Sequence, residues 1–229
     1  MKKIILLAVV FGTLLSCTGR LSAEMDSSDF VNISKEIPDL ILEIRYYTSY
    51  NFVGERIDGY EAPIALMTKE SAAALKNVSD NLVAKGYRLK IFDAYRPQTA
   101  VNHFIRWAEV TDDVRMKEYF YPDVDKSLLF ELEFICAKSS HSRGSTVDLT
   151  LFDMQSGKEV DMGGPFDWFG DLSHPDYEDL SDVQKENRRI LRDAMIEAGF
   201  KPFDTEWWHF TLKDEPFPET YFDFPVTEL

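Results

Sequence analysis

Three segments of the chain carry apolar residues three or four positions apart, the spacing of a helix. The first follows Thr68, which can cap a helix, and stops at Gly86. The second is expected from Gln98 to about Glu109, and the third lies between Ser181, which starts a capping box, and Gly199. The residues expected to face inward are Ala72, Leu75, Val78 or Ser79, and Leu82 in the first helix, Val101, Phe104, Ile105 and Ala108 in the second, and Val183, Ile190, Ala194 and Ala198 in the third.

Three other segments have the pattern of strands. Apolar and polar residues alternate over residues 88–93 and, more cleanly, over residues 147–152, while residues 207–212 form an aromatic-rich run. Helices and strands do not follow a regular strand–helix–strand order. The sequence therefore predicts a single α+β domain, with a mainly antiparallel sheet and helices packed against it.

The first sixteen residues are typical of an export signal. Lys2 and Lys3 precede an uncharged run from Ile4 to Leu15, which suits a signal peptide and is short for a membrane span. The next residues, Ser16 and Cys17, complete a segment that resembles a bacterial lipobox, in which the chain is cut before the cysteine and the cysteine is acylated. Ordinary secretory cleavage nearby and a retained membrane anchor are the alternatives.

We therefore expect a signal peptide over residues 1–16, lipidation at Cys17, a polar tether over residues 17–30 and a folded domain over residues 31–229. The mature protein would lie in the cell envelope or periplasm. It would touch the membrane only through its lipid anchor. The sequence points to no protein partner.

Composition narrows the classes of function. The 25 Lys and Arg against 40 Asp and Glu give a formal charge of −15, and no basic cluster suits a nucleic-acid partner. The 45% hydrophobic content is enough for a core, which excludes wholesale disorder. Two cysteines cannot build a disulfide framework. Cys136, with apolar neighbours, is expected to be a small buried hydrophobic residue rather than a catalytic thiol.

Two histidines and an aspartate are candidate metal ligands. His141 lies just before the strand that carries Asp148, and Gly144 permits a sharp turn between them. Asp148 stands between apolar residues, where a carboxylate is costly to bury unless a cation, an arginine or several donors satisfy it. His209 can supply a second imidazole. Two imidazoles and one carboxylate, with an open fourth position, are typical of catalytic rather than structural zinc.

Two further residues fit hydrolytic chemistry at such a metal. Glu206 stands near His209 without being needed as a ligand, which suits a general base. In an ideal strand these two side chains would point to opposite faces, so Glu206 must lie at the strand's start, where the chain bends. Arg96, at the end of a strand, could stabilise an oxyanion or form a local salt bridge to Asp93.

Several blocks carry a family resemblance between about residues 35 and 226. They are Asn51-Phe52-x-Gly54, Asp58-Gly59-Tyr60-Glu61, Ala94-Tyr95-Arg96-Pro97, Ser139-Ser140-His141-Ser142-Arg143-Gly144-Ser145-Thr146-x-Asp148-Leu149-Thr150-Leu151, Glu206-Trp207-Trp208-His209 and Tyr221-Phe222-Asp223-Phe224-Pro225. In this order and spacing they resemble the zinc D-Ala-D-Ala metallopeptidases, and more closely the VanX-type D-alanyl-D-alanine dipeptidases.

The resemblance implies a hedgehog/DD-peptidase-like fold and a zinc dipeptidase that hydrolyses D-alanyl-D-alanine or a closely related dipeptide during cell-wall peptide turnover. It implies one zinc ion per chain, held by His141, Asp148 and His209. Glu206 would be the general base, and Arg96 would steady the oxyanion.

The resemblance also implies a site for the free ammonium of the dipeptide, formed by Asp167 with Tyr46 and Ser139 beside it. Thr146 stands where the family usually has alanine. Its hydroxyl lies one strand repeat from Asp148, so it is expected to affect the surroundings of the metal without abolishing metal binding.

Two other functions stay open. A D,D- or L,D-carboxypeptidase acting on peptidoglycan stem peptides would need the ammonium end open to a longer chain, which the Asp167 candidate disfavours. A non-catalytic zinc-bearing binding module, as in hedgehog-type domains, could dispense with Glu206 and Arg96, and both are present. Export argues against a role in glycopeptide resistance, because D-Ala-D-Ala is made in the cytoplasm.

Overall fold

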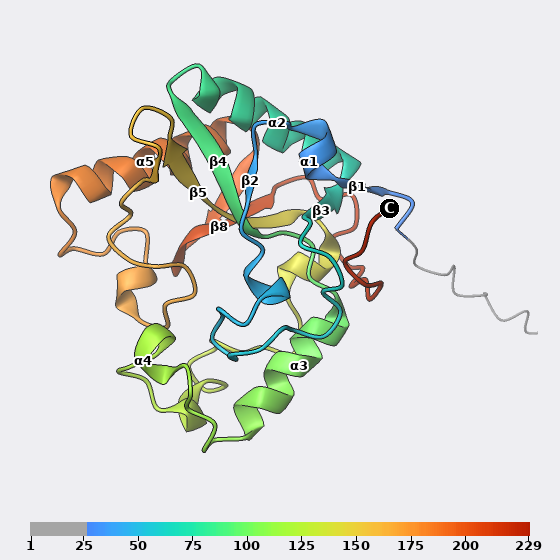
Figure 1. Ribbon diagram of the computed structural model, residues 1–229, viewed down its shortest axis with the longest axis vertical. Helices are drawn as coiled ribbons and strands as arrows, with labels where there is room; N and C mark the ends of the chain where they lie inside the picture. The colour runs from blue at the N-terminus through green and yellow to red at the C-terminus, as the bar shows by residue number, and fades with distance from the viewer. Residues whose placement is uncertain (1–26) are drawn as a thin grey trace, which may run out of the picture.

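The computed structural model describes residues 27–229 (Figure 1). The predicted signal peptide, Cys17 and most of the tether lie outside the described residues. Phe30, predicted as the last residue of the tether, is instead buried in the first strand, where its ring packs edge-on against Phe222 and Phe224. Phe30 therefore contributes an aromatic side chain to the core.

A mixed sheet forms the centre of the molecule, with strand order β2-β4-β5-β8-β7 and with β6 paired to β5. The β2–β4 pair is parallel and the other pairs are antiparallel. A separate antiparallel pair joins β1 and β3. The predicted α+β architecture with a mainly antiparallel sheet is thus confirmed. The strands are β1 (Phe30–Asn32), β2 (Ile41–Leu42), β3 (Leu66–Thr68), β4 (Tyr87–Asp93), β5 (Thr146–Asp153), β6 (Lys158–Glu159), β7 (Phe200–Phe203) and β8 (Glu206–Leu212).

The three predicted helices are present. Two of them lie on one face of the sheet, because α2 packs against β4 and α5, and α5 packs against β7 and β8. The third, α3, lies at the other end of the molecule from α2, as does the short α4 (Figure 1). The helices are α1 (Ile33–Glu36), α2 (Lys69–Val83), α3 (Gln98–Glu109), α4 (Lys117–Phe120) and α5 (Asp182–Glu197). No helix among residues 27–229 has the length and apolar character to cross a bilayer.

The predicted capping box of α5 is confirmed, since Ser181 accepts from the Gln184 amide and the Gln184 side chain accepts from the Ser181 amide. The predicted inward face of α5 is wrong at its start: Val183 is 68% exposed. The other predicted positions do face inward: Ala194 is buried, and Ile190 and Ala198 are partly buried against the core. The buried residues of the helix are Arg188, Leu191, Ala194 and Met195.

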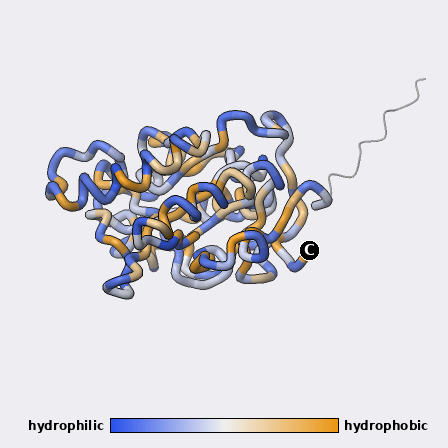
Figure 2. The backbone as a smooth tube through the Cα atoms, turned by 90° about the horizontal axis from the view of Figure 1, so that it is seen from above, coloured by the Kyte–Doolittle hydropathy of each residue, from blue (hydrophilic) through white to orange (hydrophobic). Residues whose placement is uncertain are grey.

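The central strand β5 is buried on both faces. Val147, Leu149 and Leu151 enter the hydrophobic core, as the alternation predicts. The alternate side chains Asp148 and Thr150 are buried as well, so the polar face of this strand is covered rather than open to solvent. Figure 2 shows hydrophobic stretches along the central elements and hydrophilic ones at the outer loops. A covered polar face in the middle of the sheet is where a functional site is expected.

Candidate metal centre and active site

The strand register brings the three candidate ligands together. Asp148 on β5 lies directly opposite His209 on β8, and cross-strand partners of this kind share one face of a sheet. His141 comes from the 3-10 turn Ser140–Arg143, just before β5. Gly144 ends that turn with φ +79°, and a side chain there would collide with the ring of Phe30. The sharp turn predicted at this glycine is therefore present, and it directs His141 toward the strand pair.

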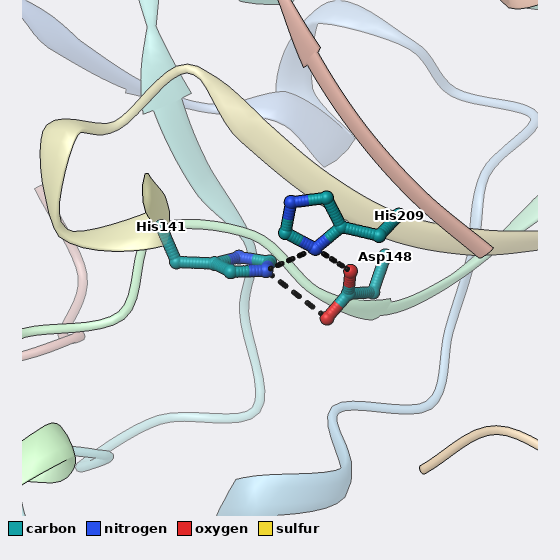
Figure 3. Close-up of side chains that lie close together, drawn as sticks. All are labelled: His141, Asp148 and His209. Carbon is teal, nitrogen blue, oxygen red and sulfur yellow. Dashed lines mark hydrogen bonds and ion pairs between the residues drawn. The ribbon is translucent and has the colours of Figure 1, made fainter. Parts of the chain in front are cut away.

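The ligand atoms of these three residues lie within 4.8 Å of one another. The Nε2 atom of His141 is 3.2 Å from Oδ2 of Asp148 and 3.3 Å from Nδ1 of His209 (Figure 3). Nδ1 of His209 is in turn 3.1 Å from Oδ1 of Asp148. The three side chains thus converge on one point between β5, β8 and the 140–143 turn.

Hydrogen bonds on the far side of each imidazole fix which nitrogen faces this point. The Ala94 carbonyl, 2.7 Å from Nδ1 of His141, can only accept, so Nδ1 carries the proton and Nε2 presents its lone pair. Ser140 Oγ lies 3.2 Å from Nε2 of His209 and can accept its proton, which leaves the Nδ1 lone pair facing inward. Outer hydrogen bonds of this kind orient the histidine ligands of metals.

The inward-facing atoms fit a cation. Asp148 Oδ1 is a buried carboxylate oxygen without a hydrogen-bond partner among the described residues. Two imidazole lone pairs and a carboxylate would repel one another at these distances unless a positive charge lay between them. Two nitrogens and one oxygen form the donor set of a catalytic zinc site. The residues present therefore fit the predicted zinc.

Burial and neighbouring charges perturb the titration of these side chains. Desolvation would raise the pKa of Asp148, but the imidazoles of His141 and His209 hold it well below its usual range. Desolvation lowers the pKa of His141 despite the nearby Asp148. The pKa of His209 is raised, because the carboxylate of Asp148 outweighs the opposing desolvation. The aspartate is therefore ionised, as a ligand must be.

Glu206 is the first residue of β8, and its position at the start of the strand is the one predicted from the sequence. Pairing with β7 jumps from Phe210 directly to Glu206, so β8 bulges between these two residues. The bulge brings Glu206 to the same side as His209, with Oε2 of the glutamate 3.4 Å from Nδ1 of the histidine. Desolvation raises the pKa of Glu206, and the charge of His209 opposes that effect.

Arg96 forms the local salt bridge that its sequence context allowed, and it also lies beside the candidate metal ligands. Its Nε donates to Oδ2 of Asp93 at 2.9 Å, the local salt bridge. The same guanidinium reaches into the cleft, where Nη2 lies 3.5 Å from Oδ2 of Asp148 and Nη1 lies 3.5 Å from Oγ of Ser139. The salt bridge to Asp93 therefore aims the cation at the metal site rather than competing with that role.

Asp167 and Tyr46 meet at the other end of the cleft. The Tyr46 hydroxyl donates to the Asp167 carboxylate at 3.0 Å, and both side chains are buried. Asp167 has φ +62°, a strained conformation for a residue other than glycine, and such strain gathers at functional sites. Desolvation, reinforced by the charge of Asp148, raises the pKa of Asp167 well above its usual range. Among the described residues no cation forms an ion pair with this carboxyl group, and the charge of Arg96 only partly opposes the rise in its pKa.

A cavity of about 370 Å³ connects these groups. It is lined by all the residues that the sequence nominated for the metal site, for catalysis and for substrate binding: Tyr46, Arg96, Ser139, His141, Asp148, Asp167, Glu206 and His209. The structure thus brings every predicted site residue of the described chain to one cleft.

Cys136 also lines this cavity, and its predicted burial is wrong: it is exposed. In its apolar segment Ile135 takes the buried position, and the thiol is left at the edge of the cleft, 3.5 Å from the Glu133 carbonyl. Desolvation raises the pKa of the thiol. A raised pKa is the opposite of what a nucleophilic cysteine needs, which agrees with the prediction that Cys136 is not catalytic.

Sequence reasoning missed the groups that hold the site in place. Ser140 and the Ala94 carbonyl orient the two imidazoles, and Tyr60 donates to Oδ1 of Asp93 at 2.6 Å behind Arg96. Each belongs to a block quoted for its resemblance, but only the spatial arrangement shows its role. The Thr146 hydroxyl lies 2.9 Å from that of Thr211, on the same strand pair as two of the ligands.

Comparisons with known proteins agree with this geometry. A family model described as D-Ala-D-Ala dipeptidase matches residues 26–227. The chain is 40% identical over 200 residues to a D-alanyl-D-alanine dipeptidase of Streptomyces coelicolor, across 87% of this chain and 99% of the relative. It is 41% identical over 185 residues to one from Enterococcus faecalis, across 81% of this chain and 92% of the relative. It is 30% identical over 187 residues to one from Escherichia coli, across 82% and 86% of the two chains.

Proposed function

Since the chain belongs to the D-Ala-D-Ala dipeptidase family, a family of metallopeptidases, we propose that it hydrolyses D-alanyl-D-alanine or a closely related dipeptide with zinc held by His141, Asp148 and His209. One observation carries the proposal. A three-ligand group, in which Oδ1 of Asp148 has no hydrogen-bond partner among the described residues, shares a cavity of about 370 Å³ with a base, a fixed cation and a buried carboxyl group. The base can take the proton that the attacking water loses, and the cation can stabilise the negative charge that forms on the carbonyl oxygen. The buried carboxyl group can bind the ammonium of a free dipeptide.

Zinc in this position supplies Lewis-acid chemistry, polarising the scissile carbonyl and making water more acidic. Glu206 takes the proton from the attacking water, since its carboxylate stands beside His209 but is not needed as a ligand. The same carboxyl group then delivers the proton to the leaving amine. The raised pKa of Glu206 suits a group that must both accept and return a proton.

Arg96 stabilises the negative charge that develops on the carbonyl oxygen. Its guanidinium is held by Asp93 and stacks over the ring of Tyr46, 4.9 Å from the ring centroid, so it needs no rearrangement during the reaction. Preorganised donors of this kind are among the largest contributors to catalysis.

Asp167 and Tyr46 receive the free ammonium of the substrate, and Ser139 lines the cleft nearby. An ammonium would give the buried carboxyl of Asp167 the cationic partner that it lacks. Asp167 and Tyr46 are only 7% and 1% exposed. A chain extending beyond the ammonium would meet this buried wall, which favours a dipeptidase over a carboxypeptidase acting on longer stem peptides.

A panel of dipeptides tests this function. LL, LD, DL and DD dipeptides, free and N-acetylated, are incubated with the zinc-loaded protein and with protein treated with a chelator. We expect turnover of the free DD dipeptide, little turnover of its N-acetylated form, and none after chelation. Equal cleavage of the N-acetylated form would indicate a carboxypeptidase. Zinc binding without any turnover would indicate a binding module.

We further propose that the protein is exported and anchored by a lipid at Cys17, which lies outside the described residues. The support is the uncharged run before Ser16-Cys17. A dipeptidase in the envelope would meet dipeptides released from the wall, so scavenging or wall turnover fits better than depletion of a cytoplasmic precursor pool.

Cys17→Ala tests the anchor. The variant should leave the membrane fraction, because stable attachment depends on the acyl chains. The chain's other cysteine supplies the matched control, Cys136→Ala, which should stay with the membranes. Unchanged fractionation of Cys17→Ala, together with a mature mass that lacks acyl groups in the unsubstituted protein, would contradict lipidation.

A further inference from the structure

A second cavity, of about 270 Å³, lies beside α5, on the other side of the β7–β8 hairpin from the cleft. Pro202 of β7 lines both cavities. The walls of the second cavity are of two kinds. One is the basic face of α5, and the other is apolar and aromatic. The basic residues are Lys185, Arg188, Arg189 and Arg192, and the aromatic ones are Tyr177, Trp207 and Phe210.

Arg188 places a buried positive charge in this wall. Its side chain belongs to a residue only 5% exposed, and its guanidinium donates to the carbonyls of Met162, Leu172 and His174 at 2.6 to 2.9 Å. Among the described residues no carboxylate forms an ion pair with it. Burial lowers the pKa of Arg188 to about 10, and only the charge of Asp161 opposes this effect. The three carbonyls satisfy hydrogen bonds but do not neutralise the charge.

The other cations of the wall differ in their partners. Arg189 pairs with Glu186 at 2.6 Å and with Asp193 at 2.9 Å, so its charge is matched. Lys185 donates to the carbonyl of Glu178 at 2.8 Å, again a neutral partner. Arg192 pairs with Asp176 at 3.2 Å, but the Asp176 side chain is 90% exposed, so solvent weakens that pair. Asp176 is the one acidic residue that the described part of the chain contributes to this wall. In a chain with a formal charge of −15, the basic lining of this cavity is unusual, and Lys185 and Arg188 in it have no carboxylate partner among the described residues.

The apolar wall of the cavity contains a hydrogen-bond donor that has no acceptor. The indole nitrogen of Trp207 is buried and has no hydrogen-bond partner in the described part of the chain. The guanidinium carbon of Arg188 lies 5.6 Å from the centroid of the Trp207 ring. The buried cation lacks a counter-charge and the buried N–H lacks an acceptor, and a bound anion would supply both.

We propose that this cavity binds the oxyanion group of a small ligand, a carboxylate or a phosphate monoester, whose apolar or aromatic body lies against Trp207 and Phe210. The oxyanion would be held by the α5 cations Lys185, Arg188 and Arg192. The bonds of Arg188 to three carbonyls also tie the loop after β6 to α5. That structural role explains its burial, but it does not explain the two further cations or the cavity.

The test uses Lys185 and Arg192, because substitution of Arg188 would release the loop. Benzoate and phenyl phosphate are titrated into the zinc-loaded protein by calorimetry at low ionic strength, with benzyl alcohol as the uncharged analogue. We expect saturable binding of at least one anion and none of the alcohol. The double variant Lys185→Gln/Arg192→Gln should weaken anion binding about tenfold or more, since hydrogen bonds to charged groups are lost. Its thermal unfolding and dipeptide turnover should not change.

Arg106→Gln is the matched control, because Arg106 is an exposed cation on α3 whose partner is Asp58. Its affinity for the anions should equal that of the unsubstituted protein. Binding of benzoate alone would identify the ligand class as carboxylates, and binding of phenyl phosphate alone would identify it as phosphate monoesters. Absence of saturable binding by both anions would overturn the proposal. Binding that the double variant retains in full would overturn it too, because the probe would then occupy another site such as the cleft.

Discussion

The two cavities on either side of the β7–β8 hairpin differ in the kind of atom that is left without a partner. In the cleft, the inward-facing atoms of His141, Asp148 and His209 can all act as acceptors, and Oδ1 of Asp148 has no hydrogen-bond partner among the described residues. In the α5 cavity, the buried group is the guanidinium of Arg188, which has only neutral partners among the described residues. The candidate metal ligands need a positive charge, and Arg188 in the α5 cavity needs a negative one. A buried charge without a counter-charge is expensive, so the missing sign identifies the class of ligand.

The cleft is supported by family membership as well as by geometry, because a dipeptidase needs a catalytic site and the cleft holds the candidate metal ligands. The α5 cavity rests on burial and charge alone. Experiments that change the cleft and leave the α5 cavity intact, or the reverse, therefore test whether the two sites are independent.

The largest effect is expected from His141→Ala. Removing an imidazole from a three-ligand group should cost more metal affinity than the about 10–100-fold typical of outer-shell substitutions. Zinc content and turnover should be lost together, while benzoate or phenyl phosphate binding at the α5 cavity persists. Metal analysis checks the first result. His103→Ala, a histidine on α3 that contacts Glu55, is the control and should keep its zinc. Stoichiometric zinc in His141→Ala would contradict the ligand assignment.

A smaller effect is expected from Asp167→Asn, which removes a charge from the cleft without touching the metal ligands. Asparagine keeps the shape and tolerates the left-handed backbone at this position. The kcat/KM for a free dipeptide should fall about 10- to 150-fold, the worth of a hydrogen bond to a charged group. Steady-state kinetics should show that the ratio of kcat/KM for the free dipeptide to kcat/KM for the N-acetylated dipeptide falls by a similar factor.

The exposed acid Asp171 gives the control variant, Asp171→Asn, which should behave as the unsubstituted protein. An unaltered preference for the free dipeptide in Asp167→Asn would mean that the ammonium binds elsewhere.

The smallest effect is expected from Thr146→Val, which removes the hydroxyl paired with Thr211 but keeps the side-chain shape. The free energy of unfolding should fall by about 1 kcal/mol, the usual net worth of one hydrogen bond, with zinc content unchanged. Thermal unfolding measures the first quantity and metal analysis the second. Thr150→Val is the matched control, because the buried Thr150 hydroxyl has no partner in the described chain and its removal should not destabilise the protein. Loss of zinc in Thr146→Val would show that this hydroxyl supports the metal site directly.

Much of the cleft could be predicted from the sequence, because its ligands break local patterns. Asp148 interrupts an apolar strand, and His209 ends an unusual aromatic block, so both residues stand out in the sequence alone. A bend near Glu206 was also predicted, because in a regular strand Glu206 and His209 would point to opposite faces. The bulge in β8 provides this bend. The outer contacts of Ser140 and the Ala94 carbonyl could not be predicted, since they depend on how a turn and a strand end meet in space.

The α5 cavity could not be predicted from the pattern of polar and apolar residues. Arg188 lies in a helix rich in charged residues, where a basic side chain is expected to face solvent. Its burial depends on loop carbonyls that are 14 to 26 residues away in the chain. Val183, predicted to face inward on the same helix, is exposed. The predicted burial of Cys136 was wrong for a related reason. Ile135 and Cys136 are adjacent in a loop, and only one of the two side chains points inward.

The distinction between ligand and base is the centre of the proposed mechanism, and Glu206→Gln tests it most directly. Glutamine keeps the size of the side chain and much of its hydrogen bonding but cannot accept the proton. Bound zinc and dipeptide turnover should be measured on the same preparation. The mechanism predicts zinc near one per chain and turnover lowered by roughly 10²–10⁴-fold, the range of general-base catalysis. Loss of zinc would show that Glu206 is a ligand, and retained turnover would show that another group activates the water.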